Sequence, residues 1–188
     1  MMAVASICFL TASAQTEKGQ FAISGKTDMS LMFAKTSLVV DSAAGEKQTS
    51  RAFNADAGFA YFVANNLAVG ITGSFKYTRT DSDNPIGYVH NYTAGVIPAI
   101  TYLFPLNGNL KPTISAGAGY MWIFASGLNA EGLTLNVAPG ISYFANRNVS
   151  LDLGVQYSYN HLTNTYGLSE YTYKQQALGF LAGLSIFF

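Results

Sequence analysis

Apolar and polar residues alternate along most of this chain. In the stretch 149–160 every second residue is Val, Leu or Tyr, and the residues between them are Ser, Asp, Gly, Gln and Asn. A similar pattern occupies 132–144. A period of two residues is that of a β-strand with two different faces. Eight strands are therefore predicted, at 20–33, 51–63, 67–79, 89–104, 110–124, 132–144, 149–161 and 174–188.

A repeated unit connects these strands. Tyr61, Tyr102 and Tyr143 are spaced by 41 residues, and each is followed by Phe or Leu, a short turn containing Asn and a further strand. Similarity at a fixed period indicates a repeated supersecondary unit. The connections alternate between short ones (64–66, 105–109 and 145–148) and longer, more polar ones (34–50, 80–88, 125–131 and 162–173). This order predicts an antiparallel meander that has all its short turns at one end.

The volume of the side chains decides which face of the strands is inside. A soluble barrel of the lipocalin type would bury the apolar face. Eight strands enclose an interior just wide enough for side chains to fill, and the apolar face carries several bulky residues per strand. The small polar set fits inside, so the apolar face is predicted to contact lipid. Hydrocarbon does not tolerate open sheet edges, so the last strand is expected to pair with the first.

Composition and charge agree with a membrane location. Charged residues make up 11% of the chain, against about 25% in soluble proteins, and no apolar run reaches the length of a membrane-spanning helix. The chain has 10 basic and 10 acidic residues without a basic stripe, so no nucleic-acid partner is expected. Aromatic residues cluster near both ends of the strands, as in transmembrane barrels. Charges within the strands have the parity of the polar face: Lys26, Asp28, Asp56, Lys76 and Asp152.

The first residues resemble a secretory signal peptide. An apolar stretch ends in Ala12-Ser13-Ala14, which predicts cleavage after residue 14 and a signal peptide over 1–14. No Lys or Arg precedes the apolar run, which leaves open a translation start further upstream; the alternative is a disordered or buried N-terminus. Cys8 is the only cysteine, so the mature chain is expected to have no disulfide and no thiol site.

Residues 20–188 resemble the small outer-membrane β-barrel proteins of Gram-negative bacteria, the OmpA/OmpX-like outer membrane protein β-barrel domain group. The terminal strand ALGFLAGLSIFF at 177–188 and the signal ending ASAQ carry the resemblance. It implies an all-β fold, an eight-stranded up-and-down transmembrane barrel with short periplasmic turns and longer extracellular loops. In that family the terminal strand is read by the barrel-assembly machinery. The resemblance assigns this role to Phe188, with Phe180, Leu184 and Ile186 on the same face.

The inward charges predict a polar network in the barrel interior. The turn at 64–66 places Asp56 opposite Ser74 or Lys76, and a cross-strand ion pair between Asp56 and Lys76 is predicted, joined by Lys26 and Asp28. One interpretation is a pore gate or selectivity ring. The favoured interpretation is a polar plug, because eight strands leave little room for a channel.

Few residues suggest catalysis or metal binding. His90 and His161 lie near the long-loop end, where Ser169, Glu170 or Asp83 would be needed to complete a hydrolase or acyl-transfer site, and no motif places them together. Two histidines are poor evidence for a metal site. No catalytic, cofactor-binding or metal-binding residue is therefore predicted.

The predicted function is that of a non-catalytic outer-membrane protein with a structural or surface-interaction role, such as adhesion. Loops 34–50 and 162–173 are the expected contact surfaces for an extracellular ligand. The alternative is porin-like passage of a small apolar solute through the barrel lumen or wall, and an outer-membrane enzyme is the third possibility. Outer-membrane lipid and the assembly machinery are the other expected partners. Pro98 and Pro139 occupy equivalent repeat positions and predict local irregularities, because proline removes a ladder donor.

Overall fold

The part of the protein that the structure describes is a barrel built from strands. The computed structural model describes residues 16–28, 35–36, 49–81, 88–125, 128–166 and 169–188. No helix among them is long and apolar enough to cross a membrane. The predicted signal peptide, 1–14, lies outside the described residues. The strands are β1 (Phe21–Asp28), β2 (Lys35–Thr36), β3 (Thr49–Ala64), β4 (Leu67–Asp81), β5 (Tyr88–Leu103), β6 (Leu110–Ala125), β7 (Leu128–Phe144), β8 (Val149–Tyr166) and β9 (Ser169–Phe187).

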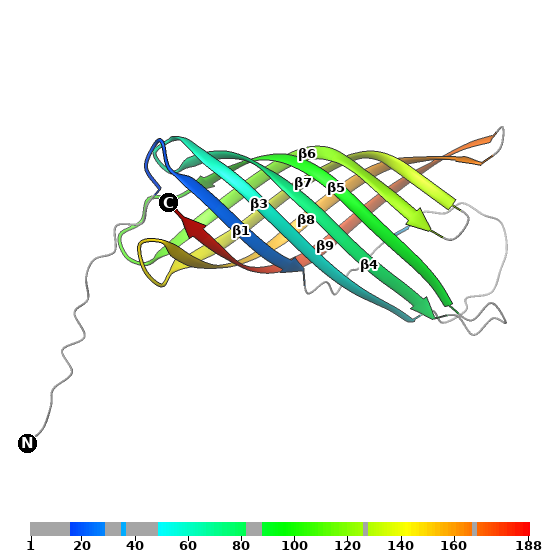
Figure 1. Ribbon diagram of the computed structural model, residues 1–188, viewed down its shortest axis with the longest axis horizontal. Helices are drawn as coiled ribbons and strands as arrows, with labels where there is room; N and C mark the ends of the chain where they lie inside the picture. The colour runs from blue at the N-terminus through cyan, green and yellow to red at the C-terminus, as the bar shows by residue number, and fades with distance from the viewer. Residues whose placement is uncertain (1–15, 29–34, 37–48, 82–87, 126–127, 167–168) are drawn as a thin grey trace, which may run out of the picture.

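The sheet closes on itself, as the alternation predicts. Each long strand pairs antiparallel with the next one along the chain, and β1 pairs with both β3 and β9 (Figure 1). Ile23 of β1, for example, lies opposite Phe59 on one side and Ile186 on the other. The short strand β2 continues the pairing with β9 beyond β1. The result is a closed, eight-stranded, up-and-down barrel, in which the pairing of β1 with β9 leaves no free edge.

The short turns lie together at the end of the barrel where the C-terminus is found (Figure 1). The tightest turn, Asn65-Asn66, joins β3 to β4, and Asn66 has a positive φ of 63°. Asn is one of the few residues that tolerate this left-handed conformation. A register irregularity between Phe62 and Ala64 accompanies the turn.

Two of the predicted long loops are wrong. Most of 125–131 and 162–173 is strand, because β7 begins at Leu128 and the β8–β9 hairpin is paired as far as Tyr166 and Ser169. Most residues from 163 to 173 are polar or aromatic in sequence, so the regular apolar alternation that marks a membrane strand is absent there. Much of the other two predicted loops, 34–50 and 80–88, lies outside the described residues.

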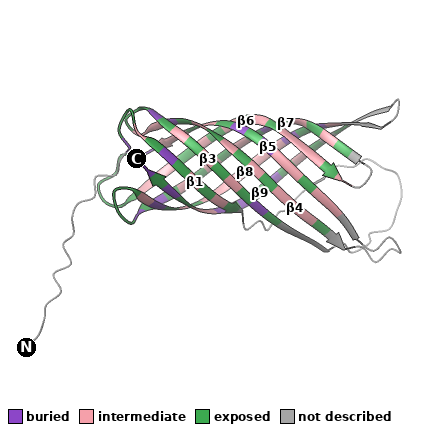
Figure 2. Cartoon of the chain, in the orientation of Figure 1, coloured by how far each residue is buried: buried purple, intermediate pink, exposed green. Residues whose placement is uncertain are grey.

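The apolar face points outward, as predicted. Figure 2 shows exposed positions alternating with intermediate or buried ones along the strands. Leu153 is 66% exposed and Leu133 is 62% exposed. These fractions would be costly in water but suit contact with acyl chains. Exposed aromatic residues lie near both ends of the barrel: Phe21, Tyr61, Phe104, Tyr143 and Phe188 near the short turns, and Phe53, Tyr92, Tyr120, Phe124 and Tyr157 toward the far end.

Pro98 and Pro139 interrupt the ladder without changing its register. The β5–β6 pairs stop at Val96 and resume at Ala99, and the β7–β8 pairs stop at Val137 and resume at Gly140. On their other sides, Pro98 and Pro139 remain paired with β4 and β6. Each proline thus directs its missing donor toward the strand that follows it.

Candidate functional site in the barrel lumen

The structure divides the predicted interior network into two parts. Asp56 lies opposite Lys26 on β1 and opposite Ser74 on β4, from which it accepts a hydrogen bond. Lys76 lies opposite Asn54, so it is diagonal to Asp56. The direct cross-strand cation for Asp56 is therefore Lys26.

Asp28 ends β1, where its backbone pairs with Leu181, and its side chain is not among those described. The Asp56–Lys76 ion pair and the joining role of Asp28 remain predictions. The register shows only that Asp56 and Lys76 occupy diagonal positions.

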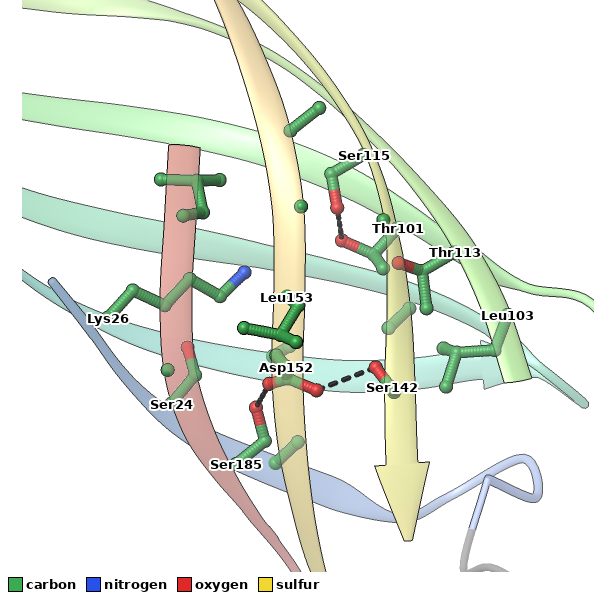
Figure 3. A pocket seen from close by; sticks show the side chains of 18 of the residues that line it. Ser24, Lys26, Thr101, Leu103, Thr113, Ser115, Ser142, Asp152, Leu153 and Ser185 are labelled. Atoms are coloured by element: carbon green, nitrogen blue, oxygen red, sulfur yellow. Dashed lines mark hydrogen bonds between the residues drawn. The ribbon is translucent and has the colours of Figure 1, made fainter. Parts of the chain in front are cut away.

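Asp152 lies in a cage of serine hydroxyls, in the same row as Lys26, because both residues are opposite Gly183 of β9. Ser142 donates to Oδ1 at 2.6 Å, Ser150 donates to the same atom at 2.9 Å, and Ser185 donates to Oδ2 at 2.5 Å. The four side chains come from β7, β8 and β9. Figure 3 shows three of them, Ser142, Asp152 and Ser185, pointing toward one another inside the wall. Charge-assisted hydrogen bonds of this kind stabilise a carboxylate away from bulk water. The sequence predicted an inward Asp152, but not its three partners.

A second polar cluster lies further from the short turns. Thr134 donates to Oδ1 of Asn160 at 2.6 Å, and Nδ2 of Asn160 donates to Oε1 of Gln175 at 3.3 Å. Thr134 and Asn160 are both buried. Together with the Asp152 cage, these bonds tie β7, β8 and β9 to one another from within the lumen.

The lumen retains a small cavity between these groups. Its volume is about 100 Å³, which is large enough to hold water. Small side chains such as Ser24, Ala60 and Thr101 line it, and Lys26 and Asp152 extend into it (Figure 3).

Four apolar side chains fill the lumen at the short-turn end. We call them the apolar plug: Phe62, Leu103, Phe144 and Phe187, exposed by 1%, 4%, 0% and 4%. The Phe187 ring lies 5.1 Å from Phe144 and 6.1 Å from Phe62, measured between centroids. The prediction of a small polar set inside the barrel missed this plug. The repeat carried the signal, because Phe62, Leu103 and Phe144 each follow one of the outward tyrosines and therefore face inward.

The segment 16–20 covers the plug at the short-turn end. Asn66 N–H donates to the Thr16 carbonyl at 2.7 Å, and the Thr16 hydroxyl donates to Oδ1 of Asn66 at 2.7 Å. Gly19 N–H donates to the Phe62 carbonyl at 2.8 Å. Lys111 Nζ donates to the Thr16 hydroxyl at 3.4 Å and lies 5.5 Å from the centroid of the Phe144 ring. The base of the barrel is thus closed by apolar packing and a hydrogen-bonded cap.

The two histidines lie on the outside of different parts of the wall. His90 is on β5, where Nδ1 is 2.6 Å from the Tyr77 hydroxyl, whereas His161 is on β8 opposite Lys174. Several strands separate them, so the structure does not bring them into one site. Asp83 and the side chains of Ser169 and Glu170 are not among the described parts of the chain.

The four residues of the predicted assembly signal share the outward face of β9 and the residue that follows it. Phe180 is 56% exposed, Leu184 41%, Ile186 38% and Phe188 60%. Their recognition by the assembly machinery remains a prediction.

A closed barrel with an apolar exterior, exposed aromatic residues near both ends and a small polar lumen defines an integral membrane β-barrel protein. The family description "Outer membrane protein beta-barrel domain" matches residues 1–185. The chain belongs to this family, and its location is the outer membrane. No curated protein matches the chain.

Solved structures share the fold at low sequence identity. The outer membrane protein OprG from Pseudomonas aeruginosa is 14% identical with a TM-score of 0.60, covering 92% of this chain and 97% of its own. The outer membrane protein AlkL in lipid bilayers is 17% identical with a TM-score of 0.62, with coverages of 94% and 93%. Neisserial surface protein A is 20% identical with a TM-score of 0.53, with coverages of 90% and 97%. At these identities the likeness establishes the fold.

Proposed function

We propose that the protein is a non-catalytic, non-conducting outer-membrane barrel that contacts an extracellular partner through its β8–β9 hairpin. The observation that carries the proposal is the length of this hairpin. The last five pairs, from Leu162–Tyr173 to Tyr166–Ser169, extend the barrel away from the short turns, and Figure 1 shows this orange hairpin reaching beyond the neighbouring strands. Pairing with β7 ends at Asn164.

The closed base supports a role at the cell surface rather than in conduction. The apolar plug leaves no aqueous route along the lumen at the short-turn end, and the remaining cavity is about 100 Å³. The hairpin sequence contains Tyr166, Tyr171 and Tyr173. Tyr is enriched in recognition surfaces because it gives a large contact area at a small entropic cost.

Adhesion measurements test this proposal. Cells producing the protein should adhere to at least one of three immobilised surfaces, collagen, fibronectin and mucin, and Tyr166→Ala/Tyr171→Ala should remove most of that adhesion. The matched control is Tyr102→Ala/Tyr143→Ala, which removes two tyrosines near the periplasmic end and should leave adhesion unchanged. Equal loss in both variants, each verified as a folded barrel in the membrane, would contradict a role for the hairpin.

A second candidate function is the passage of a small apolar solute through the barrel wall. The lumen cavity is lined by Pro139 and Leu153, although both side chains face outward. The β7–β8 ladder is interrupted at this level. Because the apolar plug blocks the short-turn end, a solute that enters the lumen from outside would have to leave through the barrel wall. The gap in the β7–β8 ladder is the weakest part of the wall that the cavity reaches.

Transfer assays distinguish the two candidates. For wall passage, Pro139→Ala restores a backbone donor and should slow the delivery of a fluorescent apolar solute into vesicles. Pro98→Ala is the matched control, because it repairs an equivalent gap that the cavity does not reach. Identical transfer in all three proteins would exclude wall passage. Steady openings in planar bilayers that change when Lys76 is replaced would instead contradict the closed lumen.

A further inference from the structure

A hollow opens on the outer face of the barrel where β6, β7 and β8 approach the far end. Its volume is about 530 Å³. The side chains that line it include Tyr120 and Trp122 of β6, Glu131 and Leu133 of β7, and His161 of β8. The exposed Leu133 lies opposite both Tyr120 and His161, and Glu131 is the next residue on the same face of β7. We call this site the boundary hollow.

The boundary hollow lies at the edge of the apolar band. On β7 every outward residue from Tyr143 back to Leu133 is apolar or aromatic, and this stretch has the length of about 9–11 residues with which a tilted strand crosses the hydrocarbon. Glu131 is the next outward residue, and it is exposed. Its carboxylate therefore lies at the level of the lipid headgroups. Leu133 and Leu135, which are 62% and 52% exposed, follow it on the hydrocarbon side.

One side of the boundary hollow suits a cation. The Tyr120 hydroxyl donates a hydrogen bond to the Glu131 carboxylate. A carboxylate has about four acceptor sites, so this bond orients the group and leaves acceptors for a second donor. Trp122 lies opposite Glu131, and its ring centroid is 5.2 Å from that of Tyr120. The faces of Trp and Tyr rings attract ammonium groups, so the carboxylate and the rings favour the same kind of ligand.

The other side of the boundary hollow suits an anion. His161 is diagonal to Glu131 across the β7–β8 pair, at a distance of about 7–8 Å for such positions. Lys174 of β9 lies opposite His161, and both side chains are exposed. An ammonium and an imidazole N–H are hydrogen-bond donors. The hollow thus has an acidic, aromatic side and a basic side on neighbouring strands.

We propose that the boundary hollow binds the zwitterionic headgroup of an ammonium-bearing phospholipid. The ammonium group lies against Glu131 and Trp122, and the phosphate lies toward His161 and Lys174. A short linker between the two charges of the headgroup matches the diagonal spacing of the acidic and basic sides. The acyl chains run along Leu133, which favours a lipid over a soluble zwitterion. This inference is independent of the proposed role of the hairpin tip.

Lipid titration tests the proposal. The folded protein in a non-ionic detergent is titrated with dioctanoyl phosphatidylethanolamine, and bound lipid is counted by native mass spectrometry. Dioctanoyl phosphatidylglycerol has the same chains and phosphate but no ammonium group, and it should bind about three- to fivefold less tightly, which is the size of an exposed ion pair or cation–aromatic contact. Glu131→Gln should remove this preference between the two lipids.

Matched variants separate the site from the rest of the surface. Trp122→Leu should weaken the binding of the ethanolamine lipid by about threefold, whereas Phe53→Leu, which removes an exposed ring from β3, should leave it unchanged. Glu17→Gln removes an exposed carboxylate at the short-turn end and should also leave it unchanged.

Three results would overturn the proposal. Equal affinity of the unaltered protein for the two lipids would show that the ammonium group is not recognised, and this comparison requires no variant to fold. Equal weakening by Glu17→Gln and Glu131→Gln would show that the attraction is diffuse. Competition by free phosphoethanolamine at concentrations equal to those of the lipid would show that the hollow takes a soluble headgroup rather than a lipid. Heat-modifiable electrophoretic mobility verifies the fold of each variant.

Discussion

At the short-turn end of the barrel, Phe62, Phe144 and Phe187 pack inside the lumen, whereas at the far end the notable groups, such as Arg79 and Glu131, lie on the outside of the wall. The first end is closed by residues that contact one another and by the cap at Thr16. The second end is formed by strands that continue past the apolar band. The same strand pairing therefore supports a closed end on one side and strands that extend beyond the apolar band on the other.

Residues at the short-turn end are therefore expected to determine the stability of the barrel, and residues at the far end its contacts with other molecules. Substitutions inside the short-turn end remove packing and hydrogen bonds that exist without any partner, so they should lower the free energy of unfolding. Substitutions in the hairpin tip change contacts with another molecule, so they should alter binding with little effect on the stability of the isolated barrel. The predictions that follow test the first half of this comparison.

Replacement of Phe144 should have the largest effect. Phe144 is fully buried in the apolar plug, and Phe144→Ala removes a core ring and leaves a cavity, which typically lowers stability by about 3–5 kcal/mol. Equilibrium unfolding by urea in lipid vesicles measures the change. The matched control is Phe59→Ala on the outer face, where the ring is 48% exposed. Equal losses in the two variants would show that the plug contributes no more than a lipid-facing ring.

Replacement of Asp152 should have an intermediate effect. Asp152→Ala leaves the hydroxyls of Ser142, Ser150 and Ser185 without their shared acceptor. Hydrogen bonds to a charged group contribute about 1.5–3 kcal/mol each, and the freed hydroxyls can partly find other partners, so a loss of about 2–3 kcal/mol is expected. Asp152→Asn keeps one acceptor oxygen and should lose less. Thermal unfolding in the same vesicles measures the stability of both variants. If both were as stable as the unaltered protein, the serine cage around Asp152 would not contribute to stability.

The fold could be predicted from the sequence because few other arrangements place the bulky apolar side chains in an apolar environment and the small polar side chains in a narrow interior. The alternation around Leu133 and Leu153 gave the strands, and the volume of an eight-stranded interior decided that these residues face outward. The polar interior was predicted in part. The plug was missed because the inward set was treated as uniform, although Phe62, Leu103 and Phe144 stand at the same position in each repeat.

Register and pairing partners were harder to predict. The turn at Asn65-Asn66 allowed either Ser74 or Lys76 opposite Asp56, and the irregularity between Phe62 and Ala64 contributes to the choice of Ser74. Such a bulge has no clear sequence signature. The sequence predicts a loop at the tip of the β8–β9 hairpin, 162–173, because its pairs, such as Thr163–Thr172, carry no apolar alternation. Cross-strand pairing there depends on the neighbouring barrel rather than on local propensity.

The turn that holds the cap should show the smallest effect. Asn66 has a positive φ and accepts a hydrogen bond from the Thr16 hydroxyl. Asn66→Ala loses this bond and places a Cβ without polar compensation in the left-handed region, for a combined loss of about 1–2 kcal/mol. Asn66→Gly loses the bond but adopts the conformation freely, so it should be less destabilised than Asn66→Ala in urea unfolding. If the two variants unfold at the same urea concentration, the left-handed turn is not a source of stability, and the closure of this end depends on the plug alone.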